Sequence, residues 1–399
     1  MRFDLNRPVP ILLLADSPSL LTGLARIAHD VAWFLSTMPE FQVGVLGRGG
    51  TGRSHFPWVS YDFGANEQWG EGRLVEVWND LSQGRRGIVM SIWDATRLLW
   101  FADPIGMPQD LQNLLSSGSV ERWGLFMSDS EGVLPGKLPL TAGHVKSKYD
   151  RILMASKWSY GITKNTLPNH PDIDWLPHPI NTNRFSPQDR MHGRSALGVG
   201  EKEVLIGCVM ANQERKHFPT VFEALARMRA TTAGKPKMWV HTNIEMLQPG
   251  IGYWNLLAMI HEYGLDGRVF LDTRPLDDKG MAMYYSACDA TVLISGGEGF
   301  GYPIAESLSC GVPCLTGAYA AGSEIASHSV AASGFKIETQ HNVKRSYYEA
   351  ALVAQSLEMI TDSVRAGEWE AEQCRGLVEH LAGDKLGKLY QQWFRKGLQ

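Results

Sequence analysis

The sequence has no apolar run that approaches the roughly 18 residues of a membrane-spanning helix. Near the start, the short apolar stretch Ile11–Ala15 follows Pro10 and ends at Asp16. This stretch is too short for the core of a signal peptide, so we interpret it as a first strand. We therefore expect a cytoplasmic protein without a transmembrane segment.

Cysteine is scarce, and its spacing shows no CxxC pair. The five cysteines are at positions 208, 288, 310, 314 and 374. This pattern argues against a disulfide framework and favours small buried thiols in a reducing compartment. The 12 histidines show neither HxxxH nor HExxH spacing, so we expect no metal site.

The charge is nearly balanced, with 38 Lys and Arg against 42 Asp and Glu and a formal net charge of −4. This balance argues against a globally basic nucleic-acid binder. With 44% hydrophobic and 20% charged residues, the composition excludes collagen-like, disordered and coiled-coil classes. A globular protein remains, and 399 residues predict two domains.

Short apolar runs alternate with helix-period patterns along the chain. Strands are predicted at 204–210, 237–241 and 290–295, with helices between them. This alternation predicts an α/β protein with a parallel, doubly wound sheet in each half.

Prolines, asparagines and a glycine pair interrupt the pattern between Pro177 and Gly200. We predict a Rossmann-like N-terminal domain over residues 1–183 and a second such domain over 184–375. The remaining residues, 376–399, are expected to form a helix that packs back across the domain junction.

The strand at 290–295 leads into a loop, Gly296–Tyr302, that contains four glycines, and Pro303 opens a helix. Glycines let the backbone approach a ligand, and free N–H groups at a helix start bind anions. Glu306, expected in the first turn, can accept both hydroxyls of a vicinal diol. Phosphate beside a diol suggests a nucleotide. In the structural alternative, the turn is merely glycine-rich and Glu306 only supports its helix.

Glu298 and Glu306 are separated by seven residues in the string EGFGYPIAESLSCGVP. This string resembles the E-x7-E signature of glycosyltransferase family 4, the retaining GT-B enzymes also described as glycosyl transferases group 1. Residues 321–325 resemble the family's Gly-Gly-x-Glu turn. The segment 177–185 resembles its interdomain segment, with departures at two positions. The resemblance covers roughly residues 8–330.

The resemblance implies a GT-B architecture of two facing Rossmann-like domains, with the nucleotide sugar on the C-terminal domain and the acceptor mainly on the N-terminal one. It implies a retaining, metal-independent transfer that needs no cofactor besides the nucleotide-diphosphate sugar as co-substrate. The donor-binding residues that it implies are Gly23, Asn212, Gly297, Gly299, Phe300, Gly301, Tyr302 and Glu306.

The family also supplies an Arg and a Lys to the diphosphate. Lys216 matches the family Lys, but Ala211 stands where the Arg is usual. Arg215 is expected to compensate, because a guanidinium fork suits phosphate, unless it is a solvated loop charge. The expected catalytic set is Glu298, Lys216, Arg215, Asp129 and Asp94. Both Asp residues end predicted strands, where they serve either the transferred sugar or a helix cap.

The acceptor stays open between a glycan, a small molecule, a lipid and a nucleic acid. Segment 137–164 is basic, with Asp150 as its one acid and with interleaved aromatic residues, so transfer to modified DNA bases is one alternative. Non-catalytic binding of a nucleotide sugar is another. An NAD-dependent oxidoreductase is discarded, because residues 17–23 lack the GxGxxG pattern.

Tryptophan is abundant, with 13 residues, nine of which precede residue 184. Indole rings pack in cores, but they also stack on sugars and bases. Our hypothesis is that at least one of four tryptophans lines the acceptor side. The four are Trp58, Trp69, Trp93 and Trp100.

Overall fold

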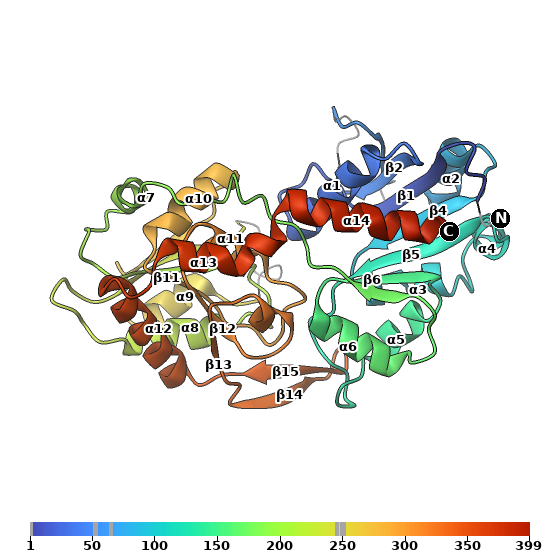
Figure 1. Cartoon of the computed structure of the whole chain (residues 1–399). Coiled ribbons are helices and arrows are strands. Elements are labelled where there is room, and N and C mark those ends of the chain that lie inside the picture. The colour runs from blue at the N-terminus through green and yellow to red at the C-terminus, as the bar shows by residue number, and fades with distance from the viewer. Residues whose placement is uncertain (1–2, 51–54, 64–66, 244–246, 248–252) are drawn as a thin grey trace. The chain divides into compact units, whose positions relative to one another are not determined.

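A computed structural model describes residues 3–50, 55–63, 67–243, 247 and 253–399 (Figure 1). The chain divides into two units. Unit 1 comprises Met1–Pro179 together with Asp384–Gln399, and unit 2 comprises Ile180–Gly383.

Unit 1 contains a seven-stranded parallel sheet of order β3-β2-β1-β4-β5-β6-β7. Its strands are β1 (Val9–Asp16), β2 (Phe41–Arg48), β3 (Val59–Asp62), β4 (Gly87–Ile92), β5 (Val120–Phe126), β6 (Arg151–Met154) and β7 (Ile173–Trp175). Its helices are α1 (Gly23–Ser36), α2 (Leu74–Ser82), η1 (Ala95–Leu98), α3 (Leu99–Ala102), α4 (Gln109–Ser116), α5 (Leu140–Lys146), α6 (Lys157–Thr166) and α14 (Gly383–Leu398). The strand order reverses between β1 and β4.

Unit 2 contains a six-stranded parallel sheet of order β10-β9-β8-β11-β12-β13. Its strands are β8 (Leu205–Val209), β9 (Lys237–His241), β10 (Val269–Asp272), β11 (Ala290–Leu293), β12 (Cys314–Gly317) and β13 (His328–Val330). Its helices are α7 (Arg190–Ala196), α8 (Phe218–Arg227), α9 (Leu256–Glu262), α10 (Asp278–Ala287), α11 (Tyr302–Ser309), η3 (Ala321–Glu324), α12 (Ala350–Arg365), α13 (Ala371–Val378) and η4 (Glu379–Leu381).

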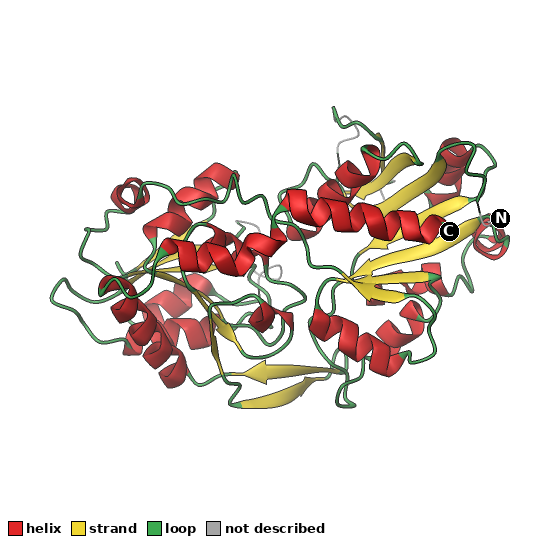
Figure 2. Ribbon diagram, in the orientation of Figure 1, coloured by secondary structure: helices red, strands yellow, loops and turns green. Residues whose placement is uncertain are grey.

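The two parallel sheets confirm the predicted α/β class, and Figure 2 shows each flanked by helices. Strands that are covered on both faces are apolar along their whole length. β1 and β4 come close to this pattern, since every residue in both strands is buried and only Asp16, at the end of β1, and Ser91, in β4, are polar. Such strands leave the loops at their carboxyl ends as the places where polar side chains gather.

A short antiparallel hairpin in unit 2 was not predicted. Its strands are β14 (Gly334–Glu338) and β15 (Val343–Tyr347). Three apolar side chains of the hairpin, Phe335, Ile337 and Tyr347, are exposed.

Helix α14 packs on the sheet of unit 1, as Figure 1 shows in red. The fully buried guanidinium of Arg151, in β6, lies over the rings of Trp123 and Trp393 at 4.9 and 4.2 Å. It donates to the Trp393 carbonyl at 2.9 Å and to Asp172 Oδ2 at 2.5 Å. This buried cation therefore fixes the last turns of α14 to β6.

Among the residues that the structure describes, no helix combines the length and the apolar character that crossing a membrane requires.

We predict that Gly397→Ala destabilises unit 1 by roughly 1–3 kcal/mol, the usual cost of overpacking. A Cβ at position 397 would overlap the Arg151 guanidinium and the Trp123 indole. Gly161→Ala in α6 is the matched control, because a Cβ there meets open space and removes a helical glycine. Thermal unfolding should show a lower Tm for Gly397→Ala and an equal or higher one for Gly161→Ala. Equal Tm values for both variants would contradict this packing.

Candidate functional site

The glycine-rich loop of unit 2 joins β11 to α11 and requires glycine at one backbone position. Gly301 caps α11 with φ of 95°, a left-handed conformation, and a Cβ there would lie 2.9 Å from Ile304 Cδ1. The helix begins at Tyr302, one residue before Pro303. Glu306 is therefore its fifth residue, and its expected position in the first turn is wrong.

Glu298 forms a charge cluster with two cations from the loop that follows β8. Its Oε1 accepts from Lys216 Nζ at 2.5 Å and from Arg215 Nη1 at 2.8 Å. Arg215 Nη1 also donates to the Gly297 carbonyl at 3.0 Å. One carboxylate and two cations leave a net positive charge beside the glycine loop. Arg215 is therefore part of the cluster and not a solvated loop charge.

Electrostatics keep this carboxylate ionised. Burial alone would raise the pKa of Glu298, but the charges of Lys216 and Arg215 outweigh burial and bring it below its usual value. Glu298 is only 7% exposed, so solvent screens the charges of this cluster poorly. Lys216 and Arg215 would therefore attract a bound anion strongly.

Glu306 accepts a hydrogen bond from a tyrosine that the sequence did not indicate. The hydroxyl of Tyr285, in α10, donates to Glu306 Oε2 at 2.8 Å. Burial and the Glu306 charge raise the pKa of Tyr285 well above its usual value, so the hydroxyl remains a donor. Trp239, in β9, contacts Tyr285 edge-on at 5.9 Å and stacks on Tyr284 at 5.1 Å. The carboxylate of Glu306 is thereby held in one orientation.

His241, at the carboxyl end of β9, is a second residue that the sequence did not indicate. Burial lowers its pKa below the usual range, although the charges of Asp272 and Glu306 oppose the shift. Its ring stacks on Trp239 at 5.7 Å. A neutral imidazole therefore lies near the Glu306 carboxylate.

Asn212 is 1% exposed and serves its own loop. Its side-chain amide donates to the Trp254 carbonyl at 2.7 Å and accepts from the Trp254 N–H at 2.9 Å. The Trp254 indole donates in turn to the Lys216 carbonyl at 2.9 Å. Asn212 thus positions the segment that carries Arg215 and Lys216.

Hairpin strand β15 supports the glycine loop from the other side. The buried Ser346 donates its N–H to the Gly296 carbonyl at 3.2 Å and its hydroxyl to the Ser295 carbonyl at 3.4 Å. The same hydroxyl is 2.8 Å from that of Tyr348. The start of the loop is therefore tied to the unpredicted hairpin.

The other predicted loop residues lie where the sequence placed them. Gly297 is buried, Gly299 is half-buried, and the rings of Phe300 and Tyr302 meet edge-on at 5.2 Å. Both rings are buried and line the turn into α11. The structure thus gathers the predicted loop residues of unit 2 around one βα turn.

The remaining predicted residues belong to unit 1. Gly23 is the first residue of α1. Asp94, after β4, is exposed and accepts from the N–H and hydroxyl of Thr96 at 2.9 Å each, so it caps η1. Asp129 follows β5 and accepts from the Ser130 hydroxyl at 3.1 Å. The capping alternative thus describes the geometry of Asp94, while both Asp residues lie at the carboxyl edge of the sheet.

Lys146 is a residue of unit 1 that sequence reasoning did not single out. It ends α5, is 1% exposed and donates to the Ser128 hydroxyl, beyond the end of β5, at 2.7 Å. Burial lowers its pKa to about 7, against the opposing charge of Asp94. A buried ammonium held by a hydroxyl is therefore close to losing its proton at neutral pH.

Three of the four tryptophans proposed for the acceptor side are core residues, since Trp58, Trp93 and Trp100 are buried. Trp69 is half-buried. It follows β3 and contacts Trp93 edge-on at 5.3 Å. Three of these four indoles therefore contribute to core packing, and only the ring of Trp69 is partly exposed among the four.

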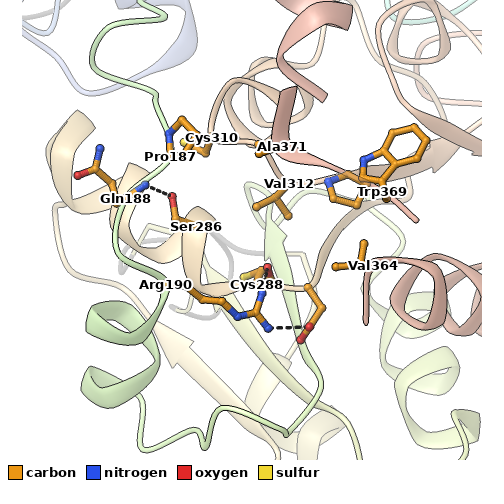
Figure 3. A pocket seen from close by; sticks show the side chains of 13 residues that line it. Pro187, Gln188, Arg190, Ser286, Cys288, Cys310, Val312, Val364, Trp369 and Ala371 are labelled. Carbon is orange, nitrogen blue, oxygen red and sulfur yellow. Dashed lines mark hydrogen bonds and ion pairs between the residues drawn. The ribbon is translucent and has the colours of Figure 1, made fainter. Parts of the chain in front are cut away.

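Unit 2 contains a small cavity, whose lining side chains Figure 3 shows. Asp289 and Pro313, which precede β11 and β12, line it, together with Arg190 and Trp369. Arg190 is paired with Asp289 at 2.7 Å. The volume of about 160 Å³ is below the ~300 Å³ at which ligand pockets begin, so this cavity does not hold a nucleotide sugar.

In the part of the chain that the structure describes, no three His, Cys, Asp or Glu side chains gather in a way that could hold a metal ion.

Comparisons with known proteins agree with this geometry. Residues 190–351 match the family described as glycosyl transferases group 1. A D-inositol 3-phosphate glycosyltransferase of Geodermatophilus obscurus is 29% identical over 157 residues, covering 36% of this chain and 32% of that protein. One from Mycobacterium sp. (strain KMS) is 30% identical over 159 residues, covering 39% and 33%. The chain thus matches about a third of the length of these curated relatives.

Solved structures share the whole fold. Sucrose-phosphate synthase from Thermosynechococcus elongatus has a TM-score of 0.72 at 15% identity and covers 97% of this chain and 100% of its own. Anabaena Alr3699/HepE in complex with UDP-glucose has a TM-score of 0.70 at 13% identity and covers 97% and 99%. The likeness confirms the predicted GT-B fold.

The buried Lys146 predicts a pH dependence of stability. Below pH 7 the ammonium is charged in both folded and unfolded chains, and the cost of burying it is fully present. Between about 7 and the ordinary value near 10.5, unfolding takes up a proton, so stability rises with pH by at most ~1.4 kcal/mol per unit. Urea unfolding should show this rise in the wild type and not in Lys146→Met.

Lys148→Met, at an exposed neighbouring position, is the control and should keep the wild-type slope. Parallel pH profiles for the wild type and Lys146→Met would show that Lys146 titrates normally.

Proposed function

Because residues 190–351 of this chain match the family described as glycosyl transferases group 1, we propose that the protein is a glycosyltransferase. It moves a sugar from a nucleotide-diphosphate sugar to an acceptor hydroxyl with retention of configuration, without a metal ion. The donor binds to unit 2 and the acceptor to unit 1. We further propose a cytoplasmic location.

The observation that carries this proposal is the pair of buried glutamates of which one, Glu298, lies in the glycine loop and the other, Glu306, in the helix that follows it. Glu306 is held by Tyr285 with oxygens suited to a ribose diol, and Glu298 holds Lys216 and Arg215 in place. The N–H groups at the start of α11 and the two cations suit a diphosphate. Groups suited to the ribose and groups suited to the diphosphate therefore lie close together along the chain.

The proposed reaction breaks the bond between sugar C1 and the diphosphate oxygen and forms one between C1 and the acceptor oxygen on the same face. The acceptor proton passes to the departing phosphate oxygen. Negative charge grows on the diphosphate as the bond breaks, and Lys216 and Arg215 stabilise it. Such a preorganised group contributes ~2–4 kcal/mol to transition-state stabilisation.

Arg215 also bears on the alternative of a non-catalytic binder, which rested on Ala211 at the usual Arg position. Its guanidinium contacts Glu298 and the Gly297 carbonyl, so a second cation is present at the loop. A solved neighbour of the same fold binds UDP-glucose, which makes UDP-sugars the first donors to test. Transfer to modified DNA bases is an acceptor hypothesis within the same reaction.

We predict that Glu306→Ala weakens nucleotide binding by roughly 10- to 100-fold, because hydrogen bonds to a charged group contribute ~1.5–3 kcal/mol. Lys216→Met should lower turnover by roughly 100-fold or more while the nucleotide still binds. Calorimetric titration with UDP, GDP, ADP and dTDP, and hydrolysis of the matching sugars, measure both effects.

Glu372→Ala and Lys235→Met, at exposed positions of unit 2, are the matched controls and should behave as the wild type. Unchanged binding and turnover in Glu306→Ala and Lys216→Met would refute the site. Nucleotide binding without release or transfer of sugar from any donor would favour the non-catalytic binder.

A further inference from the structure

Trp69 lies at the carboxyl edge of the sheet of unit 1, where buried residues hold its side chain in place. Its ring meets the fully buried Trp93 edge-on at 5.3 Å. The Trp93 indole donates to Oδ1 of Asp16, the last residue of β1, at 3.0 Å. Asp16 and Trp93 therefore hold the half-buried indole of Trp69 near the end of β1.

Two exposed arginines stack on this indole. Cζ of Arg48, the last residue of β2, lies 4.6 Å from the Trp69 ring centroid, and Cζ of Arg97, in η1, lies 4.7 Å from it. The two guanidinium carbons are therefore no more than about 9 Å apart. Within the described ranges, no ion pair joins either of them to a carboxylate.

This arrangement differs from that of other arginines in unit 1. Arg73 donates to Glu76, and Arg395 donates to Glu40. Arg48 and Arg97 instead lie over the Trp69 ring and, among the described residues, form no ion pair with a carboxylate. Stacking of this kind restricts the guanidinium before any ligand arrives.

Several carboxylates near the arginine pair have other partners, and Glu71, two residues after Trp69, accepts from the Trp69 N–H at 2.9 Å. Asp16 accepts from Trp93 and, at 3.4 Å, from the Thr22 hydroxyl. Asp94 accepts twice from Thr96. Asp62, at the end of β3, forms no ion pair with Arg48 or Arg97 in the part of the chain that the structure describes. Among the described residues of unit 1, therefore, no carboxylate forms an ion pair with either arginine.

The pair also lies where α/β sheets bind ligands. Arg48 and Arg97 follow β2 and β4, the strands on either side of β1, and the strand order reverses between β1 and β4. The crevice at such a reversal, outside the carboxyl ends of the strands, is the usual ligand site of a doubly wound sheet.

We propose that Arg48, Trp69 and Arg97 form an anion-binding subsite on unit 1 that takes a phosphate group of the acceptor. Guanidinium forks match phosphate oxygens in pairs, and the indole keeps both forks oriented. The subsite rests on the proposed function, which gives unit 1 the acceptor. The phosphate belongs either to a phosphorylated sugar or to the backbone of a nucleic acid, since both present the same oxygens.

Calorimetric titration tests the subsite on the full chain saturated with UDP, so that the diphosphate site of unit 2 is occupied. The probes are glucose 6-phosphate, glucose and a short oligothymidylate. We expect a phosphate-bearing probe to bind and glucose to bind at least 10-fold more weakly. Arg48→Gln and Arg97→Gln should each weaken the phosphate-bearing probe by about 10-fold or more, and added salt should weaken it in the wild type. Arg7→Gln, an exposed arginine of unit 1 away from Trp69, is the control.

Each outcome of these titrations either supports the subsite or overturns it. Binding of glucose 6-phosphate identifies a sugar phosphate as the source, and binding of the oligothymidylate alone identifies a nucleic acid. The proposal is overturned if neither probe binds, or if the double variant Arg48→Gln/Arg97→Gln binds them as the wild type does. A lowered Tm with unchanged binding assigns the arginines to stability alone. UDP affinity, measured separately, tests the proposed function. If UDP does not bind, the comparison of the wild type with Arg48→Gln/Arg97→Gln still decides whether a probe binds at the subsite of unit 1.

Discussion

The attraction between one buried carboxylate and two cations organises the site in unit 2. Glu298 draws Lys216 and Arg215 to the glycine loop, and their charges keep it ionised although burial opposes this. Leaving a buried charge without its partners is costly, so the three side chains hold one another in place. The net positive charge that remains is what a diphosphate requires. Asn212 and Ser346 then act as supports, because they fix the two loops that carry the cluster.

The two sheets of the chain carry different kinds of side chain at their carboxyl edges. In unit 2 the carboxyl edge combines cations, loop N–H groups and a carboxylate held by Tyr285, which suits a nucleotide. In unit 1 the carboxyl edge combines Asp16, the stacked Trp69 and the buried Lys146, which suits a polar acceptor with its own charge. Both edges follow from one rule, since buried parallel strands leave polar side chains only at their ends.

Periodicity predicted the parallel sheets, and the resemblance carried by the motif from Glu298 to Glu306 implied the GT-B fold and the loop residues, because these depend on local patterns. The position of Glu306 within its helix was wrong, since α11 begins one residue before Pro303. Tyr285, Ser346 and Lys146 escaped prediction for another reason. Each reaches its partner from a separate element of the chain, and no local spacing reports such a contact. The tryptophan excess shows the same limit, because only the packing separates the half-buried Trp69 from the core indoles.

The central claim is that Glu306 binds the ribose hydroxyls of a nucleotide. Calorimetry with UDP and with 2′-deoxy-UDP, on the wild type and on Glu306→Gln, tests it directly. If Glu306 accepts from the 2′-hydroxyl, removing that hydroxyl weakens binding to the wild type by roughly 10-fold, the loss of ~1.5 kcal/mol for one charge-assisted hydrogen bond. The same removal then has little effect on Glu306→Gln, because the charged acceptor is already gone. Equal losses in both proteins would contradict the account.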